Sequence, residues 1–589
     1  MNSKNKPIIE FKNLSFQYDA QSKPTLKNIN LSIYQGEKVL IVGQSGSGKS
    51  TLAHIINGLI PNYYTGEVKG SVTVCGLNPV ITPLNVTAKK VGTVLQDSDG
   101  QFIGLTVAED ISFCMENECV SKEEMKRKVL QVAQSVSIES KLSSSPQDLS
   151  GGQKQRVTMA GVLVEDVDVL LFDEPLASLD PASGRQTIEL IDEIHKKENK
   201  TVIIIEHRLE DVLHRNVDRI VLVSKGEIVF DGTPAEIIAS GILPENGIRE
   251  PLYISAMHLA NSQLEHENKQ LITSEQNPET VDSFVVNKQL INVFKQWACD
   301  DIKPFSENKI ILDIRDLSFD IDGTFILKNI SLKIRKGEML SICGSNGAGK
   351  STLSKLICGF EKLTSGTIFF DGEDITDVPI ARRGKKIGFV IQNPNQMISK
   401  TMIYDEINLG LKHLGLSKEE ADKRIAKALQ ICGLYRFKDW PLSALSYGQK
   451  KRVTIASIMA LQPEIVILDE PTAGQDWAHY TEIMDFLRKL NDLGTTIVLI
   501  THDMHLALEY TNRAVVMSNG TIIADDTPAN ILTDEKVTKA ADLVTTSLYD
   551  FAKKHGIEPA SNFIHNFIQH DKVWRENILK NKNFDADNA

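Results

Sequence analysis

A long internal repeat constrains this chain more than any other feature. Corresponding positions of the two copies lie about 300 residues apart: 301 for Lys49 and Lys350, and 295 for His207 and His502. Because each copy exceeds two hundred residues, the repeat predicts two duplicated domains rather than small stacked units. The repeated segments are GQSGSGKST at Gly43 and GSNGAGKST at Gly344, LSGGQKQR at Leu149 and LSYGQKKR at Leu445, and LLFDEP at Leu170 and VILDEP at Val466.

Each copy alternates apolar runs with helical segments. KVLIVG, VDVLLFD and TVIIIEH in the first copy correspond to MLSICG, EIVILDE and TTIVLITH in the second. Continuous runs of this kind are typical of parallel strands that are buried on both faces. Ser121 with Glu124, and Ser417 with Glu420, have the spacing of a helix capping box. The sequence therefore predicts two α/β domains, each with a helical insertion between the glycine-rich loop and the LSGGQ or LSYGQ segment.

The repeat also divides the chain. We expect a first domain over residues 1–240, a partly helical connector over 241–309, a second domain over 310–535 and a C-terminal helical extension over 536–589. The connector loses the strand pattern and carries 6 Lys and Arg against 10 Asp and Glu. The extension contains amphipathic stretches such as LVTTSLYDFAKKHG, for which the sequence indicates no task.

Composition indicates a globular protein outside the membrane. No window approaches the roughly 18 consecutive apolar residues of a membrane-spanning helix. The first residues, MNSKNKPIIEF, lack the apolar core and cleavage site of a signal peptide. The seven cysteines form no C-x-x-C pair, which favours reduced thiols in a cytosol. A formal charge of −12 argues against a nucleic-acid surface, because such surfaces need basic groups to neutralise phosphates.

Both copies contain a phosphate-loop pattern, G-x-x-x-x-G-K-[ST], between an apolar strand and a plausible helix. In this pattern the backbone amides cradle phosphate groups, the lysine reaches the outer phosphates and the hydroxyl binds Mg²⁺. An inconsequential glycine-rich turn would not explain two such loops in register with other motifs. The residues expected to bind nucleotide are Gly43, Ser45, Gly46, Gly48, Lys49, Ser50 and Thr51, and Gly344, Asn346, Gly347, Gly349, Lys350, Ser351 and Thr352.

Two adjacent carboxylates follow a buried strand in each copy: Asp173 and Glu174, and Asp469 and Glu470. We predict that the aspartate serves Mg²⁺ and that the glutamate orients or deprotonates the attacking water. This division of roles suits phosphoryl transfer, which depends mainly on positioning and charge neutralisation. A solvated acidic turn would not explain why DEP recurs identically after both strands.

The LSGGQKQR segment, together with the phosphate loop and LLFDEP, resembles the ABC ATPase family, and the resemblance covers both copies. It implies an α/β fold of two P-loop NTPase cassettes, each with a mostly parallel sheet core, an antiparallel β subdomain and a helical subdomain. It also implies ATP and Mg²⁺ as cofactors. A lone histidine after a strand is usually structural, but matching offsets in both copies favour function. The resemblance assigns Gln96 and Gln392 as Q-loop glutamines, His207 and His502 as switch histidines, Asp180 and Asp476 as D-loop residues, and Ser50, Gln96, Asp173, Ser351, Gln392 and Asp469 to Mg²⁺.

In this family two cassettes face each other, and each ATP lies between the phosphate loop of one and the LSGGQ motif of the other. The resemblance therefore implies hydrolysis at two composite sites formed within one chain. Fusion of the two copies raises their effective concentration. The γ-phosphate contacts across the interface would come from Ser150, Gly151, Gly152 and Gln153, and from Ser446, Gly448 and Gln449.

The two copies differ at two expected contact positions. Tyr447 replaces the first glycine of the motif in the second copy, for which we expect an altered but active site. Tyr18 stands where the family places an aromatic that stacks on adenine, and Ile321 occupies this position in the second copy. An aliphatic residue there would weaken base binding modestly, although Tyr18 could also be a core aromatic at a strand end. Both copies keep glutamate, histidine and Q-loop glutamine, so we expect two hydrolysis-competent sites.

The segments after the Q-loops, QDSDGQFIGLTVAEDISF and QNPNQMISKTMIYDEINLGL, are similar to those of energy-coupling factor (ECF) transporter ATPases. Gln101, Gln396 and the EHRLED segment at Glu206 also match that group. The similarity implies uptake of a vitamin or metal ion, with a transmembrane coupling subunit and a substrate-capturing membrane subunit as partners. It implies a peripheral location at the cytoplasmic face of the cell membrane.

Other classes remain open from the sequence. Double-cassette translation factors that act on ribosomes also lack membrane spans, but their connectors tend to be basic whereas this one is net acidic. A duplicated sugar-importer ATPase or an ordinary importer pair is the closer alternative. No recognisable motif encodes the transported substrate, the subunit stoichiometry or the relative activity of the two sites.

Overall fold

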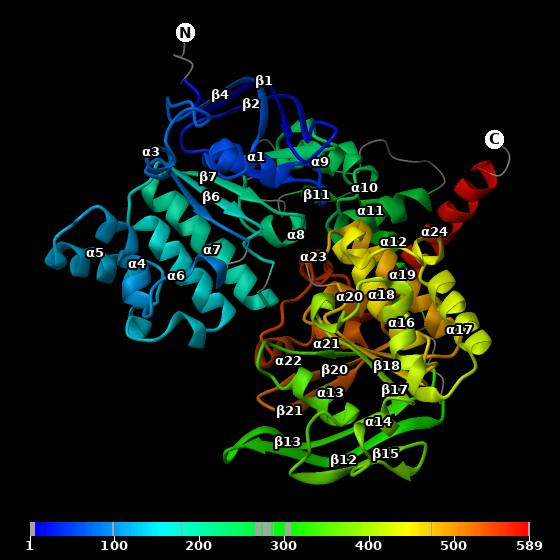
Figure 1. The fold of residues 1–589 in the computed structure, drawn as a ribbon. Helices are drawn as coiled ribbons and strands as arrows, with labels where there is room; N and C mark the ends of the chain where they lie inside the picture. Colours follow the sequence, from blue (N-terminus) through cyan, green and yellow to red (C-terminus); the bar gives the residue numbers. More distant parts are fainter. Residues whose placement is uncertain are drawn as a thin grey trace. The chain divides into compact units, whose positions relative to one another are not determined.

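The computed structural model describes residues 6–96, 99–177, 179–264, 272–274, 284–286, 288–300, 308–472 and 474–586. These residues form two compact units (Figure 1). The first unit holds the first repeat and the second unit holds the second repeat with the C-terminal helices. We describe each unit by itself.

A six-stranded sheet forms the centre of the first unit, in the order β5-β6-β7-β3-β8-β9. The first five strands are parallel and β9 runs antiparallel to β8. The expected strands of KVLIVG, VDVLLFD and TVIIIEH are β3, β6 and β7, and each is buried along its whole length. Burial on both faces explains their continuous apolar sequence. The α/β prediction is therefore confirmed.

The elements of the first unit have the following bounds: β1 (Ile9–Tyr18), β2 (Leu26–Ile33), β3 (Lys38–Val42), α1 (Lys49–Ile56), α2 (Leu59–Asn62), β4 (Gly66–Val74), α3 (Leu84–Ala88), β5 (Val91–Val94), α4 (Val107–Asn117), α5 (Lys122–Ser135), α6 (Gly151–Leu163), β6 (Val169–Asp173), α7 (Pro181–Glu198), β7 (Thr201–Ile205), α8 (Leu209–Val212), β8 (Arg219–Ser224), β9 (Glu227–Gly232), α9 (Pro234–Ser240) and α10 (Ile242–Glu245).

A smaller antiparallel sheet and a helical segment complete this unit. The sheet has the order β2-β1-β4 and packs its apolar side chains into the same core as β3 and α1. The inserted helices are α4, α5 and α6. Ser121 caps α5 as predicted, accepting a hydrogen bond from the Glu124 amide at 3.4 Å. Full reciprocal capping boxes form instead at Thr106 with Glu109 and at Thr233 with Glu236.

The second unit repeats this arrangement. Its central sheet has the order β17-β18-β19-β14-β20-β21, with five parallel strands and β21 antiparallel, and its antiparallel sheet has the order β13-β12-β15-β16. Ser417 caps α17 by accepting from the Glu420 amide, but the Glu420 side chain pairs with Arg424 and does not complete a capping box. The reason is competition: Arg424 lies one helical turn along the same face and offers a charge-assisted partner.

The elements of the second unit have the following bounds: β12 (Ile310–Ile321), β13 (Thr324–Arg335), β14 (Met339–Cys343), α13 (Lys350–Cys358), β15 (Ser365–Phe370), β16 (Glu373–Asp374), α14 (Ile380–Arg383), β17 (Ile387–Val390), α15 (Pro394–Met397), α16 (Ile403–Leu411), α17 (Lys418–Ile431), α18 (Tyr447–Met459), β18 (Ile465–Asp469), α19 (Trp477–Asp492), β19 (Thr496–Ile500), α20 (Met504–Tyr510), β20 (Arg513–Ser518), β21 (Thr521–Asp526), α21 (Pro528–Thr533), α22 (Glu535–Ala540), α23 (Ser547–His555) and α24 (Ala560–Ala586).

The expected connector holds α11 (Leu252–Ser262), the two-stranded sheet β10 (Ile272–Ser274) with β11 (Phe284–Val286), and α12 (Lys288–Cys299). In the second unit, α12 packs against α24 of the C-terminal extension. Phe294 and Trp297 of α12 meet Phe551, Phe563 and Phe567 through ring contacts with centroids 5.4 to 6.4 Å apart. The second part of the connector and the extension thus share one aromatic core.

The described part of the chain contains no helix that combines the length and apolar character needed to cross a bilayer. All seven cysteines are free thiols.

Candidate functional site

The phosphate loop of the first unit joins β3 to α1, where the predicted strand–loop–helix context is present. Glycine is required at Gly43, because a Cβ there would lie 2.2 Å from the carbonyl oxygen of Val223. Gly344 has the same restriction against Met517 in the second unit. The loop backbone therefore lies against β8, and in the second unit against β20, more closely than any side chain would allow.

The phosphate-loop lysines are buried and directed at the backbone of their own loops. Lys49 Nζ donates to the carbonyl oxygens of Gly43 at 2.8 Å and Gln44 at 2.9 Å. Lys350 makes the matching pair of bonds at 2.8 Å in the second unit. Burial lowers the pKa of Lys49, and the nearby carboxylates of Glu174 and Asp173 oppose this shift. Each ammonium group is thus held against the backbone of its own phosphate loop.

Asp173 ends β6 directly beside the phosphate loop. Its Oδ1 atom accepts a hydrogen bond from Ser50 Oγ at 3.4 Å. Burial raises the pKa of Asp173, and the Ser50 hydroxyl opposes the shift. Asp469 has the same surroundings, with burial raising its pKa and Ser351 opposing. In the described residues, no cluster of three or more His, Cys, Asp or Glu side chains could hold a metal by itself. A hydroxyl next to a carboxylate does suit Mg²⁺, which keeps several waters and substrate phosphates as ligands.

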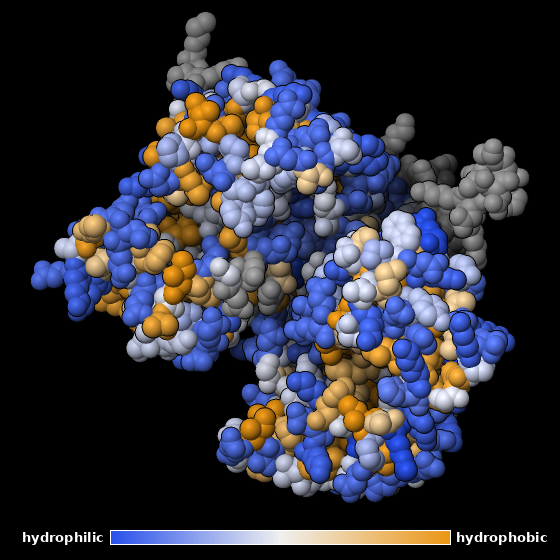
Figure 2. Space-filling view, in the orientation of Figure 1, coloured by the Kyte–Doolittle hydropathy of each residue, from blue (hydrophilic) through white to orange (hydrophobic). Residues whose placement is uncertain are grey.

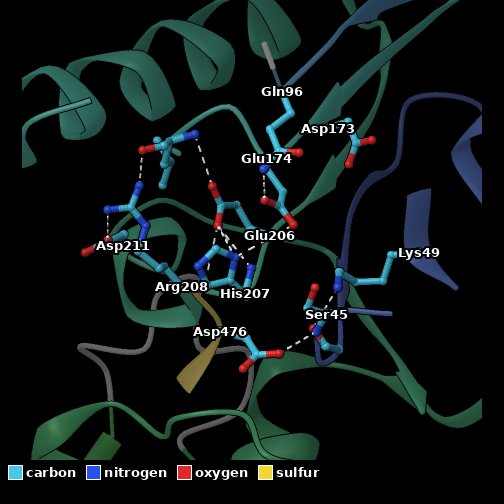
Figure 3. A network of polar contacts seen from close by, with 12 residues as sticks. Ser45, Lys49, Gln96, Asp173, Glu174, Glu206, His207, Arg208, Asp211 and Asp476 are labelled. Carbon is cyan, nitrogen blue, oxygen red and sulfur yellow. Dashed lines mark hydrogen bonds and ion pairs between the residues drawn. The ribbon is translucent and has the colours of Figure 1, made fainter. Parts of the chain in front are cut away.

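Glu174 and Glu470 stand in the left-handed backbone region, with φ of 49° and 44°. Non-glycine residues adopt this conformation at a cost, and such strain concentrates at functional sites. In the first unit, Gln96 Nε2 donates to Glu174 Oε2 at 2.7 Å (Figure 3). The structure therefore brings the predicted Q-loop glutamine onto the predicted catalytic glutamate.

The switch histidines differ between the two units. His502 lies with Nδ1 2.7 Å from Glu470 Oε1, and its backbone amide donates to the same oxygen at 3.1 Å. The corresponding distance from His207 Nδ1 to Glu174 Oε1 is 3.9 Å. The glutamate is thus bound to the histidine in one unit and to the Q-loop glutamine in the other.

The signature motifs lie at helix N-termini. Ser150 caps α6 and forms a capping box with Gln153, and Ser446 caps α18 and forms one with Gln449. The glycines of each motif occupy the first helical turn, where backbone amides lack intrahelical acceptors. The D-loop residue Asp180 is itself the cap of α7 and accepts from the Ser183 amide at 2.9 Å.

The second unit ties its signature helix to its own Q-loop. Lys451 is 2% exposed and donates to the carbonyl oxygens of Ile391 at 3.1 Å and Gln392 at 2.6 Å. Tyr447, the departure noted in the sequence, donates its hydroxyl to the Gln392 carbonyl at 3.5 Å. Gln155 stands at the position of Lys451 in the first unit, and its buried Nε2 atom has no hydrogen-bond partner among the residues that the structure describes.

In the first unit a different residue fixes the start of the Q-loop. Gln101 accepts from the Leu95 amide at 2.9 Å and donates to the Thr93 carbonyl at 3.3 Å, which fixes its side chain along the end of β5. The role of Gln101 is thus a local one in the backbone of the loop.

Tyr18 is the candidate for adenine stacking. Its hydroxyl lies 3.0 Å from Thr51 Oγ1, and its ring meets Phe16 edge to face with centroids 4.7 Å apart. Ile321 is 54% exposed at the end of β12. Tyr18 therefore borders the phosphate-loop helix and also packs on a core aromatic. This position is compatible both with adenine stacking and with a core role.

Sequence reasoning missed Glu206 as a member of the site. This residue precedes His207, is fully buried and binds three backbone amides around the histidine and the Glu174 loop. A signal was present, since EHR in the first copy corresponds to THD in the second. The residues on both sides of the histidine therefore differ in charge between the two copies.

Comparison with known proteins places the chain in a family. The sequence profile of the ABC transporter family matches residues 26–177 and 327–473, and a profile described as an ATP-binding cassette cobalt transporter matches residues 240–319. A solved structure of cbiO1 from Clostridium perfringens, titled as part of the ABC transporter complex cbiONQ, is 36% identical, covers 39% of this chain and 94% of its own, and has a TM-score of 0.37.

Two curated relatives match along nearly the whole chain. A putative ABC transporter ATP-binding protein of Clostridium perfringens is 55% identical over 97% of this chain and 99% of its own length. One of Enterococcus faecalis is 53% identical over the same shares. With two matched cassettes and relatives of this identity, the chain belongs to the family of ABC transporter ATP-binding proteins, which hydrolyse ATP to drive transport across a membrane.

Proposed function

We propose that this chain energises an importer of the energy-coupling factor type that takes up a metal ion or a vitamin. The observation that carries the proposal is the match of residues 240–319 to a profile described as an ATP-binding cassette cobalt transporter. This segment lies outside the two matched cassettes, so it adds information that the shared ATPase motifs do not contain. The QDSDGQF and QNPNQM segments after the Q-loops support the same group.

We also propose the division of labour at the two ATP sites. Glu174 and Glu470 orient or deprotonate the attacking water, and His207 and His502 contact the γ-phosphate. Mg²⁺, when bound with ATP, would neutralise phosphate charge beside Ser50 and Asp173, and beside the corresponding pair in the second cassette. Each site is completed by the signature serine and glycine amides of the other cassette, whose positions at helix N-termini suit them to bind an anion.

The surface after the first Q-loop suits a membrane subunit. Ile103 is 64% exposed and Leu105 is 83% exposed just before α4. Apolar colour appears among the hydrophilic surface over α4 to α6 (Figure 2). Exposed apolar residues close in sequence to the predicted Q-loop glutamine are suited to receive a transmembrane coupling subunit, which would hold the chain at the cytoplasmic face of the membrane.

Purification from membranes tests the proposal most directly. The chain should copurify with a transmembrane coupling subunit and a substrate-capturing subunit, and cells lacking it should lose uptake of a metal ion or vitamin. Leu105→Glu should reduce recovery of the coupling subunit, whereas Ile81→Glu, at a site that is 80% exposed, should not. Recovery with ribosomes at moderate salt, and not with membranes, would contradict the proposal.

Separate mutation of the glutamates tests the two sites. Glu174→Gln and Glu470→Gln should each lower ATPase activity without abolishing it, because each leaves one complete site. If one change abolished activity and the other left it untouched, the prediction of two hydrolysis-competent sites would be wrong.

A further inference from the structure

Glu206 is a buried carboxylate to which none of the family motifs assigns a task. Its side chain is 0% exposed at the end of β7. Oε2 accepts from the backbone amides of His207 at 3.0 Å and Arg208 at 3.3 Å, and Oε1 accepts from the Leu176 amide at 3.1 Å. A buried charge is costly unless it is fully hydrogen-bonded, and three backbone donors meet that need.

These bonds join two segments that both carry site residues. Leu176 follows Glu174 by two positions and precedes the D-loop, whereas His207 and Arg208 follow β7. Arg208 strengthens the same link from the other side, because its guanidinium donates to the Leu176 carbonyl and also lies 3.6 Å from Asp211. Leu176 is thus held at its amide by Glu206 and at its carbonyl by Arg208.

Figure 3 shows Glu206 and His207 side by side, with Glu174 and Gln96 on the neighbouring strand ends. Glu206 occupies the hydrogen-bonding space around the histidine backbone, and His207 Nδ1 lies 3.8 Å from it and 3.9 Å from Glu174. Glu174 is therefore left to bind Gln96 at 2.7 Å.

In the second cassette, different residues surround the corresponding glutamate and histidine. Thr501 stands at the position of Glu206, and its hydroxyl donates to Glu470 Oε2 at 3.4 Å. Asp503 stands at the position of Arg208 and caps α20 by accepting from the amides of His505 and Leu506. Here the residue before the histidine binds the glutamate itself, and the histidine does so too at 2.7 Å.

We propose that Glu206 is a positioning residue for hydrolysis in the first cassette. It fixes the backbone of the Glu174 loop relative to the switch histidine, so that the glutamate is presented to Gln96 and the attacking water rather than to His207. Arg208 completes the link. The inference rests on the proposed roles of Glu174 and His207, and it implies that the two cassettes set the same chemistry by different supports.

The test uses the full chain and its Glu470→Gln variant, in which the remaining hydrolysis belongs to the site of Glu174. Glu206→Thr, which introduces the residue of the second cassette, should lower kcat about tenfold in the Glu470→Gln chain, because a misplaced group loses rate steeply with distance. ATP affinity should change less than about twofold, since Glu206 accepts its hydrogen bonds from backbone amides after β6 and β7 and not from the phosphate loop. Glu206→Gln, which keeps one acceptor oxygen, should restore part of the rate.

Amide hydrogen exchange provides a readout that does not depend on turnover. The Leu176 amide should exchange about tenfold faster in Glu206→Thr, because it loses its acceptor. Glu189→Gln is the matched control: it removes a carboxylate of the same cassette that pairs with Arg215 on the surface, and both readouts should stay as in the parent chain.

The outcomes distinguish the proposed role of Glu174 from the proposed role of Glu206. If Glu174→Gln left the activity of the Glu470→Gln chain intact, the proposed role of Glu174 would be wrong. If Glu174→Gln abolished that activity while Glu206→Thr changed neither kcat nor Leu176 exchange, the positioning role alone would be overturned. If the Leu176 amide exchanged faster while kcat stayed unchanged, the positioning role would also be overturned. The contact between Glu206 and Leu176 would then be structural only.

Discussion

His502 and Glu470 are in direct contact, with Nδ1 2.7 Å from the carboxylate oxygen, whereas 3.9 Å separates His207 from Glu174. The difference follows from the preceding residue. Thr501 donates its hydroxyl to Glu470, whereas Glu206 binds the Leu176 amide in the first cassette. Two cassettes that share the glutamate, the histidine and the Q-loop glutamine therefore differ in how these residues are connected.

The histidines should consequently differ in importance. His502→Ala should lower hydrolysis at its own site about a hundredfold, since it removes both the partner of Glu470 and the proposed phosphate contact. His207→Ala should cost only about tenfold, because Glu174 keeps its bond to Gln96. ATPase rates of His502→Ala in a Glu174→Gln chain and of His207→Ala in a Glu470→Gln chain measure each loss separately. Equal losses would show that the contact with Glu470 does not matter for turnover.

A buried ion pair between Lys38 and Asp192 distinguishes the first cassette, with both side chains 5% exposed or less. The second cassette has Met339 in place of this lysine. Lys38→Met should destabilise the first unit by about 3 kcal/mol, because it leaves Asp192 charged and buried with Lys196 as its remaining ion-pair partner among the described residues. Denaturant unfolding measures the change. Lys38→Met with Asp192→Leu should recover most of it, and a double variant as unstable as the single one would contradict this account.

Arg383 stabilises the end of the phosphate-loop helix in the second cassette. Its guanidinium donates to the carbonyl oxygens of Leu356 and Ile357 at the end of α13, and to those of Thr376 and Val378. Arg383→Met should cost about 3 kcal/mol, because several buried acceptors lose a charged donor together. Arg382→Met, at the exposed neighbouring position, should change stability by less than about 0.5 kcal/mol in the same unfolding experiment.

Glu250 makes stability depend on pH. Burial raises its pKa from 4.5 to about 7, so between these values the folded chain binds more protons than the unfolded chain. The free energy of unfolding therefore falls as the pH rises from 4.5 through 7. Glu250→Gln should stabilise the chain by up to about 3 kcal/mol at pH 8 and by much less at pH 5. Denaturation midpoints of both chains at the two pH values test this. An advantage of the variant that does not grow with pH would contradict the assignment to Glu250.

The sequence predicted the strands and motif residues well because their signals are local. The strand end at Asp173 and the phosphate loop at Lys49 follow from apolar runs and a fixed spacing. In the structure Ser50 of this loop contacts Asp173, and Gln96 contacts Glu174. The capping boxes at Ser121 and Ser417 were predicted from spacing alone, and only half of each forms, because spacing does not reveal what else competes for the glutamate.

Contacts between distant segments were beyond prediction from one sequence. Glu206 binds Leu176 across thirty positions, and Lys451 reaches the Q-loop across sixty. Neither contact leaves a periodic or motif signal, because each depends on which strand ends become neighbours in the sheet. Comparison of EHR with THD showed that a difference existed, and only the fold showed what the difference holds.

The packing of α12 against α24 sets the unit that can be exchanged between proteins. Asn566 Nδ2 donates to the Trp297 carbonyl at 2.8 Å, so a connector helix and the C-terminal helix are joined although 269 positions separate these two residues. A chimera that replaced only residues 310–535 would join a foreign cassette to two helices adapted to each other and to this one. The part of the second half that can be transferred intact is therefore the cassette together with both flanking helices. A chimera should be joined before α12.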